Sequence, residues 1–287
     1  MMRIAMSLSL LAAVLVPGQA AAADPGCPDQ RMFQVGGNGD PTARVFDRGN
    51  AELPAGVDAV KVVYPAEIWP LDPKTLDDSN AEGRAELDRM VTEFHASCPG
   101  SRITITGFSQ GALVAGDVLG EYSRTDRIPH SLINGVLYAD ARRAGVGGKP
   151  GGIMTTLPTF VPGITMGGPR TFGDLPVVSL CNQNDGMCYS ENPLTNLLAF
   201  ANGIYGYLNG AHGQYDFRPV THSGSANTVV AQPPLLPYGP PLPLPIPTPW
   251  ELVNGKPAAG VVKNIRDAVA PVLPSSSRLS EFPFLGV

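Results

Sequence analysis

Short apolar stretches alternate along this chain with stretches of helical periodicity, and this alternation constrains the fold more than any other feature. Strands that alternate with helices are typical of parallel α/β sheets. The last two apolar stretches are almost uninterrupted, as strands covered on both faces should be. The sequence therefore predicts an α/β fold with a central parallel sheet flanked by helices. The expected strands are 31–35, 59–64, 103–106, 132–138 and 176–180, and the expected helices are 79–97, 112–122 and 192–208.

A Gly-Phe-Ser-Gln-Gly motif at 107–111 joins one of these strands to the following helix. Small residues on either side of a serine permit a tight, strained turn that lifts the serine oxygen to the top of the sheet. The N–H group of the next residue then points toward a developing oxyanion. The motif alone recurs by chance in a glycine-rich chain, and the surrounding strand and helix make it specific. We therefore predict Ser109 as a nucleophile and Gln110 as an oxyanion donor.

A serine nucleophile needs a base, and the chain has four histidines. In folds with this motif the chain order is nucleophile, acid and then histidine. His95 precedes the serine, and His130 follows it too closely to leave room for an acid-bearing strand. His212 and His222 remain. His212 is preferred because the glycines around it form a loop suited to present an imidazole.

The acid should follow a late strand of the sheet. Asp185 lies just beyond the strand predicted at 176–180, between Cys181 and Cys188, which are close enough in sequence to close a small rigid loop. Such a loop would fix the carboxylate that orients the histidine. Asp140, which ends the strand predicted at 132–138, is the alternative acid.

The first residues have the layout of a signal peptide. Arg3 precedes an apolar stretch at 4–16, and four alanines at 20–23 precede Asp24. A membrane anchor and a lipoprotein signal are the alternatives. The apolar stretch is short for a bilayer span, and Cys27 lacks a lipobox. We expect residues 1–23 to be removed on export, which places the mature protein outside the cell or in the cell envelope.

The exported part contains four cysteines, Cys27, Cys98, Cys181 and Cys188. An even count in an oxidising compartment predicts disulfides, and four cysteines allow three pairings. A metal site is the weaker interpretation, because no CxxC pair is present. The sequence shows no motif for a metal or a nucleotide cofactor, and we expect neither.

Composition limits the class of protein and its organisation. The net charge of −5 and the absence of a basic stripe argue against nucleic-acid binding. We expect a catalytic domain at 24–230 and a Pro-rich C-terminal extension at 231–287, with one weak helical stretch at 261–269.

Taken together, these residues resemble the cutinase-like serine esterases, which have the three-layer α/β-hydrolase fold. The resemblance covers about residues 27–217. Its anchors, in chain order, are Cys27, Cys98-Pro99, the motif at 107–112, the 181–188 loop with Asp185, and Ala211-His212.

The resemblance implies a Ser109–Asp185–His212 triad and disulfides Cys27–Cys98 and Cys181–Cys188. It also implies a second oxyanion donor in the loop after the first strand. Cutinases usually carry a hydroxyl residue there, whereas this chain offers Gly37 or Asn38.

The segment between Asp185 and His212 is longer than in cutinases and is more similar to the PE-PPE hydrolase domain of mycobacteria and their relatives. Its predicted helix at 192–208 begins with an Asn-Pro pair and has almost no charge. Phe200 and Tyr207 lie off its main apolar stripe. Either the helix is packed in the core, or it is a flap that offers a second apolar face to an acyl chain or a lipid surface.

Two classes of function follow from the sequence. The first is a secreted serine esterase that hydrolyses carboxylic esters of a lipid, an acylglycerol or a polyester, with an acyltransferase on cell-envelope lipids as a variant. The second is a non-catalytic cell-envelope protein that retains the fold and uses its Pro-rich tail for wall contact.

Overall fold

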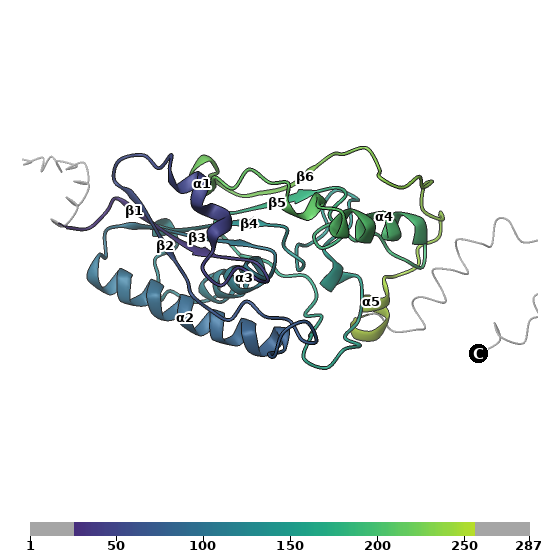
Figure 1. Ribbon diagram of the computed structural model, residues 1–287, viewed down its shortest axis with the longest axis horizontal. Helices are drawn as coiled ribbons and strands as arrows, with labels where there is room; N and C mark the ends of the chain where they lie inside the picture. Colours follow the sequence, from purple (N-terminus) through teal and green to yellow (C-terminus); the bar gives the residue numbers. More distant parts are fainter. Residues whose placement is uncertain (1–25, 256–287) are drawn as a thin grey trace, which may run out of the picture.

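In the computed structural model, which describes residues 26–255, a six-stranded parallel sheet runs through the centre of the molecule (Figure 1). Its spatial order is β2-β1-β3-β4-β5-β6, so the chain winds outward in both directions from β1 and β3. The signal peptide predicted at 1–23 and the helical stretch predicted at 261–269 lie outside the described residues. The strands are β1 (Gln30–Val35), β2 (Val57–Lys61), β3 (Arg102–Phe108), β4 (Ile133–Tyr138), β5 (Val177–Asn182) and β6 (Ala226–Val230).

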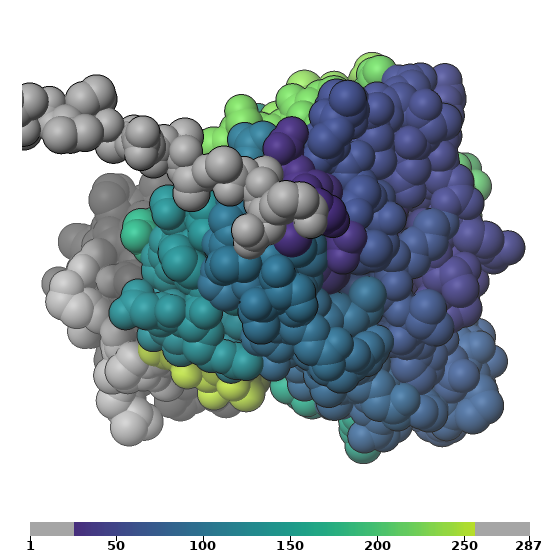
Figure 2. All heavy atoms as spheres, turned by 90° about the vertical axis from the view of Figure 1, so that its left-hand side faces the viewer, coloured from purple at the N-terminus to yellow at the C-terminus, as the bar shows by residue number. Residues whose placement is uncertain are grey.

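Helices cover both faces of this sheet, which confirms the predicted three-layer α/β arrangement. The long α2 (Leu76–Ser97) and α3 (Gln110–Tyr122) pack on one face, while the short α1 (Asp47–Asn50) lies on the other (Figure 1). Side chains alternate between the faces with the period of two that a strand imposes. Leu137 of β4 faces the large core beneath α2 and α3, whereas its neighbour Tyr138 faces an aromatic cluster that includes Phe46. Seen from the left-hand end of Figure 1, the surface is formed largely by the N-terminal half of the described chain (Figure 2).

Several element boundaries differ from those predicted, and one strand was not predicted at all. β2 ends at Lys61 rather than at residue 64, and Val62 and Tyr64 are buried in the core after the strand has ended. α3 begins at Gln110, directly after Ser109. β6 was not predicted, because it is a half-exposed edge strand of mixed residues rather than an apolar stretch.

The fourth helix, α4 (Leu197–Leu208), begins later than predicted and is not packed in the core. Asn196, not Asn192, is its N-cap, with a side chain that accepts a hydrogen bond from the N–H of Ala199. The buried positions of α4 are small or polar, whereas its leucines face outward. Its buried residues are Ala199, Asn202, Gly203 and Gly206, and its most exposed are Leu197 (65%), Leu198 (62%) and Leu208 (73%).

The inward face of α4 consists of small residues because the helix contacts another backbone directly. A Cβ atom on Gly206 would lie 2.0 Å from the carbonyl oxygen of Asn184, and one on Gly186 would lie 2.5 Å from the carbonyl carbon of Gly203. The side chains of Asn184 and Asn202 also share a hydrogen bond. α4 is therefore docked by close backbone approach and amide bonding rather than by apolar burial.

Residues 233–246 pack along α4 and the loop before it (Figure 1), whereas Trp250 packs against residues 156–168. The side chain of Asn184 donates to the carbonyl of Pro233, that of Asn196 donates to Gly239, and that of Asn202 accepts from the N–H of Leu236. The segment ends in α5 (Pro249–Asn254), which has a capping box at its start. No helix within residues 26–255 is long and apolar enough to cross a membrane.

Two disulfides join the four cysteines, Cys27 to Cys98 and Cys181 to Cys188, as the resemblance implied. The first closes 71 residues and ties the start of the chain to the end of α2, whereas the second closes 7 residues after β5. A longer closed loop removes more conformational entropy from the unfolded chain.

We expect loss of the Cys27–Cys98 disulfide to lower the free energy of unfolding by about 2–5 kcal/mol. Loss of Cys181–Cys188 should cost less, because its loop is shorter. Urea unfolding of the two paired Cys→Ser variants measures both values. A larger loss for the Cys181→Ser, Cys188→Ser variant would contradict this ranking.

Candidate active site

Ser109 occupies a strained turn between the central strand β3 and α3. Its backbone has φ of 55° and ψ of −117°, a conformation that residues with side chains rarely adopt. The two glycines of the motif allow the turn. A Cβ atom on Gly107 would lie 2.1 Å from the carbonyl oxygen of Gly111, and one on Gly111 would lie 2.2 Å from that of Val35. The motif thus forms the strand–turn–helix structure that the sequence predicted.

His212 lies beside Ser109, in the short 3-10 helix η4 (Ala211–Gly213) that follows α4. Its Nε2 atom is 2.7 Å from the Ser109 Oγ. The imidazole ring packs between Phe108 and Tyr207, at centroid distances of 4.9 and 4.8 Å. Strand β3 and α4 therefore hold the ring from two sides.

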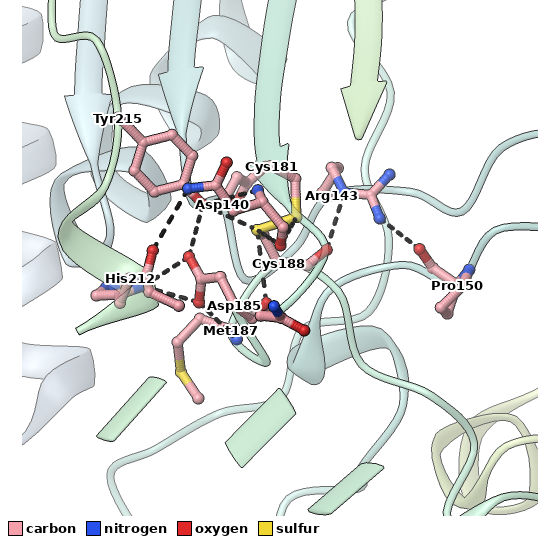
Figure 3. Close-up of a disulfide and its surroundings, with 12 residues drawn as sticks. Asp140, Arg143, Pro150, Cys181, Asp185, Met187, Cys188, His212 and Tyr215 are labelled. Carbon is pink, nitrogen blue, oxygen red and sulfur yellow. Dashed lines mark hydrogen bonds and ion pairs between the residues drawn. A yellow bond between two sulfur atoms is a disulfide. The ribbon is translucent and has the colours of Figure 1, made fainter. Parts of the chain in front are cut away.

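Asp185 completes a continuous hydrogen-bonded chain from Ser109. It is fully buried in the 181–188 loop after β5, and its carboxylate oxygens lie 2.8 and 2.9 Å from His212 Nδ1 (Figure 3). Because the carboxylate accepts a hydrogen bond from Nδ1–H, Nε2 carries no proton and is left to accept the Ser109 hydroxyl proton. Burial without a donor would be costly for this carboxylate, and the N–H group of Met187 supplies another donor at 3.1 Å.

Tyr215 also bonds to Asp185, and the sequence analysis did not identify it. Its hydroxyl donates to Asp185 Oδ2 at 2.6 Å and accepts from the N–H of Asn182 at 3.1 Å (Figure 3). Burial and the neighbouring Asp185 charge raise the pKa of Tyr215, so the hydroxyl keeps its proton. Its position three residues after His212, in an aromatic segment, was the only signal available in the sequence.

Arg143 anchors the loop of the acid from the other side (Figure 3). This buried side chain donates to the carbonyl of Cys188 at 2.8 Å, to the side chain of Asn227 in β6 at 2.8 Å, and to the carbonyl of Pro150. Burial lowers the pKa of Arg143 below its ordinary value. These bonds connect the disulfide loop to the sheet edge.

The alternative acid and base lie elsewhere in the structure. Asp140 is buried in an ion pair with Arg170, at 2.6 Å, and accepts a bond from the N–H of Arg142. His222 packs its ring against Tyr138, and burial lowers its pKa. The structure thus brings Asp185 and His212 to Ser109 and gives Asp140 a role in the arginine network beside α3.

The predicted oxyanion donors lie on two segments next to Ser109. Gln110 is the first residue of α3, and its side chain is held by the carbonyl of Glu67 and by Ser79 and Asn80. Within residues 26–255, its backbone N–H has no acceptor. This group is available for a negatively charged oxygen, as is typical of a helix N-terminus.

The loop after β1 provides the other candidates, Gly37 and Asn38. A Cβ atom on Gly37 would lie 3.0 Å from the ring of Phe108, which places its backbone against the residue before Ser109. The side chain of Asn38 donates to the carbonyl of Ala66 at 2.9 Å and to Asp72. The N–H groups of Gly37 and Asn38 have no acceptor among the described residues. In that part of the chain, no group of three or more His, Cys, Asp or Glu residues could hold a metal ion.

Comparison with known proteins shows which proteins this chain is similar to. A curated relative, "Carboxylesterase Culp6 homolog" from Corynebacterium glutamicum, is 37% identical over 169 residues, which are 52% of this chain and 54% of that protein. The chain therefore matches about half the length of this relative.

Similar solved structures include the catalytic core domain of an acetyl xylan esterase from Trichoderma reesei, with 20% identity and a TM-score of 0.42 over 65% of this chain and 98% of that one. A cutinase-like protein from Cryptococcus sp. has 17% identity and a TM-score of 0.43 over 71% of this chain and 100% of that one.

The family assignment rests on a third finding rather than on these structures. The family model described as Cutinase matches residues 29–206, which are more than half of the 287 residues. In agreement with the resemblance inferred from the sequence, the chain belongs to the cutinase family.

Proposed function

We propose that this protein is an exported serine esterase that hydrolyses carboxylic esters through Ser109, His212 and Asp185. The observation that carries the proposal is the hydrogen-bonded chain from the Ser109 hydroxyl through His212 to the buried Asp185, with links of 2.7 and 2.8 Å. It begins at a serine in a strained turn directly before α3. A base that is oriented by an acid in this way activates a serine nucleophile.

The proposed reaction has two steps. Ser109 Oγ attacks the ester carbonyl while His212 Nε2 takes the hydroxyl proton, and Asp185 stabilises the resulting imidazolium. The C–O bond to the alcohol breaks, and His212 returns the proton to the leaving alcohol. Water then attacks the acyl-enzyme with His212 as base, which releases the carboxylic acid and restores Ser109.

The negative charge on the tetrahedral oxygen needs fixed donors. We assign the Gln110 N–H as one donor and the N–H of Gly37 or Asn38 as the other. Support comes from the position of Gln110 at the start of α3 and from the absence of a described acceptor for any of these three groups. The reaction uses no metal or cofactor in this scheme.

We further propose that the substrate is a lipid, an acylglycerol or a polyester, bound with its acyl part against α4. Three leucines of α4 are between 62% and 73% exposed, and residues 192–214 include no Asp, Glu, Lys or Arg. Tyr207 of the same helix contacts the His212 ring. An exposed apolar surface beside a reaction centre is suited to a long acyl chain or to contact with a lipid or cell-envelope surface.

The proposed location is outside the cell or in the cell envelope. Both disulfides support an oxidising compartment, and the apolar stretch at 4–16 supports export. We assign catalysis to residues 24–230 and treat 231–287 as an extension, of which residues 233–246 pack on α4 and the loop before it.

Two alternatives share parts of this proposal. An acyltransferase on cell-envelope lipids would use the same acyl-enzyme but pass the acyl group to an alcohol instead of water. A non-catalytic envelope protein would have no need of the Ser109–His212–Asp185 chain, and the name of the curated relative favours an esterase.

We expect Ser109→Ala to abolish hydrolysis of p-nitrophenyl butyrate and labelling by a fluorophosphonate probe. His212→Ala should lower kcat by about 10⁴-fold, because the triad acts as a unit. His222→Ala is the matched control and should retain activity. An inactive His222→Ala beside an active His212→Ala would disprove the assignment of the base, and an unlabelled wild-type protein would favour the non-catalytic alternative.

A second prediction concerns the apolar surface of α4. Leu197→Asp and Leu208→Asp should each raise KM for long-chain p-nitrophenyl esters about tenfold, which is about 1.4 kcal/mol of binding, and leave acetate esters unchanged. Melting temperature should change little, because both side chains are exposed.

The matched control is Val253→Asp on α5, where the side chain is 70% exposed. It should leave the chain-length dependence unchanged. A large fall in melting temperature for the α4 variants, with equal loss on all esters, would show that α4 serves the fold and not the substrate.

A further inference from the structure

The Tyr215 hydroxyl occupies a position that links three parts of the site. It donates to Asp185 Oδ2 at 2.6 Å, accepts from the N–H of Asn182 at the end of β5 at 3.1 Å, and lies 3.4 Å from Cys188 Sγ. One side chain therefore joins the last residue of a central strand, the disulfide loop and the acid (Figure 3).

The carboxylate of Asp185 has a fixed set of donors among the described residues. His212 Nδ1 bonds to both oxygens, the Met187 N–H reaches Oδ1, and Tyr215 reaches Oδ2. Tyr215 is thus the only side chain besides His212 that donates to this buried charge within residues 26–255. When one donor to a buried charge is removed, the charge interacts more strongly with its remaining donors.

We propose that Tyr215 is a positioning residue for the esterase reaction, holding Asp185 against His212 and sharing the negative charge of the carboxylate. The inference rests on the proposed function of the triad, because Tyr215 acts through Asp185 on His212, the proposed base. Tyr215 and His212 are three residues apart on one segment, so the same stretch of backbone presents the base and fixes its acid.

The other charged and titratable groups around Asp185 and His212 do not donate to the Asp185 carboxylate in place of Tyr215. Tyr207, from α4, packs on the His212 ring. Arg143, from the segment after β4, is directed to the carbonyls of Cys188 and Pro150 and to Asn227, and not to the carboxylate. Because burial and Asp185 raise the pKa of Tyr215, its phenol remains a donor over the working pH range of a histidine base.

Removal of the Tyr215 hydroxyl should shift the pH dependence of kcat/KM in a defined direction. Without the Tyr215 bond, more of the Asp185 charge acts on His212, so the imidazole binds its proton more tightly. The acidic limb of kcat/KM should then move to higher pH. The carboxylate is also less fixed, so fewer molecules have the imidazole aligned with Ser109, and kcat falls.

The test is Tyr215→Phe, which keeps the ring and removes the hydroxyl. We expect kcat for p-nitrophenyl butyrate to fall about tenfold with little change in KM, and the acidic limb to move up by about half a pH unit. The matched control is Tyr138→Phe. Tyr138 lies in the same aromatic cluster, 6.1 Å from the Tyr215 ring, and its buried hydroxyl has no partner among the described residues.

A second measurement separates this proposal from the function on which it rests. The NMR titration of the labelled His212 imidazole needs no turnover, and its midpoint should move up in Tyr215→Phe but not in Tyr138→Phe. A wild-type protein that neither hydrolyses esters nor labels at Ser109 would reject the esterase function. An unchanged midpoint in Tyr215→Phe, or an equal kcat loss in Tyr138→Phe, would reject the role of Tyr215 instead.

Discussion

The close approach of α3 to the central strands is the constraint on which the rest of the site depends. Gly111 lies against the carbonyl oxygens of Val35 and Gly36 at the end of β1, where even a methyl group would collide. This approach fixes the height of Ser109 above the sheet and the direction of the first N–H groups of α3. The loop after β1, with Gly37, is thereby placed next to the serine.

The part of the site that follows chain order and local chemistry could be predicted from the sequence. The motif around Ser109, the position of Asp185 after β5 and the order of acid and histidine each depend on neighbouring residues or on sheet topology. The short spacing of Cys181 and Cys188 already suggested that they pair, whereas the Cys27–Cys98 disulfide came from the family resemblance. These features are local or are shared by relatives, so they can be predicted from the sequence alone.

Features set by long-range packing could not be predicted. The periodicity of α4 showed an apolar stripe but not which side faces the protein, and the inward side proved to be glycine, alanine and asparagine because its partner is the backbone of residues 184–186. Tyr215 reaches Asp185 across 30 positions of sequence. β6 has no apolar pattern because it is an exposed edge. In each case the decisive neighbour is distant in the chain.

The asparagine contacts of residues 231–246 have a consequence for local unfolding. Proline has no N–H group to donate, so this Pro-rich segment has little secondary structure of its own and depends on the amides of Asn184, Asn196 and Asn202. A segment held by a few such bonds forms a separate unit of low local stability, which opens before the sheet does. Since Asn184 directly precedes Asp185, such an opening would disturb the position of Asp185 first and the position of Ser109 only afterwards.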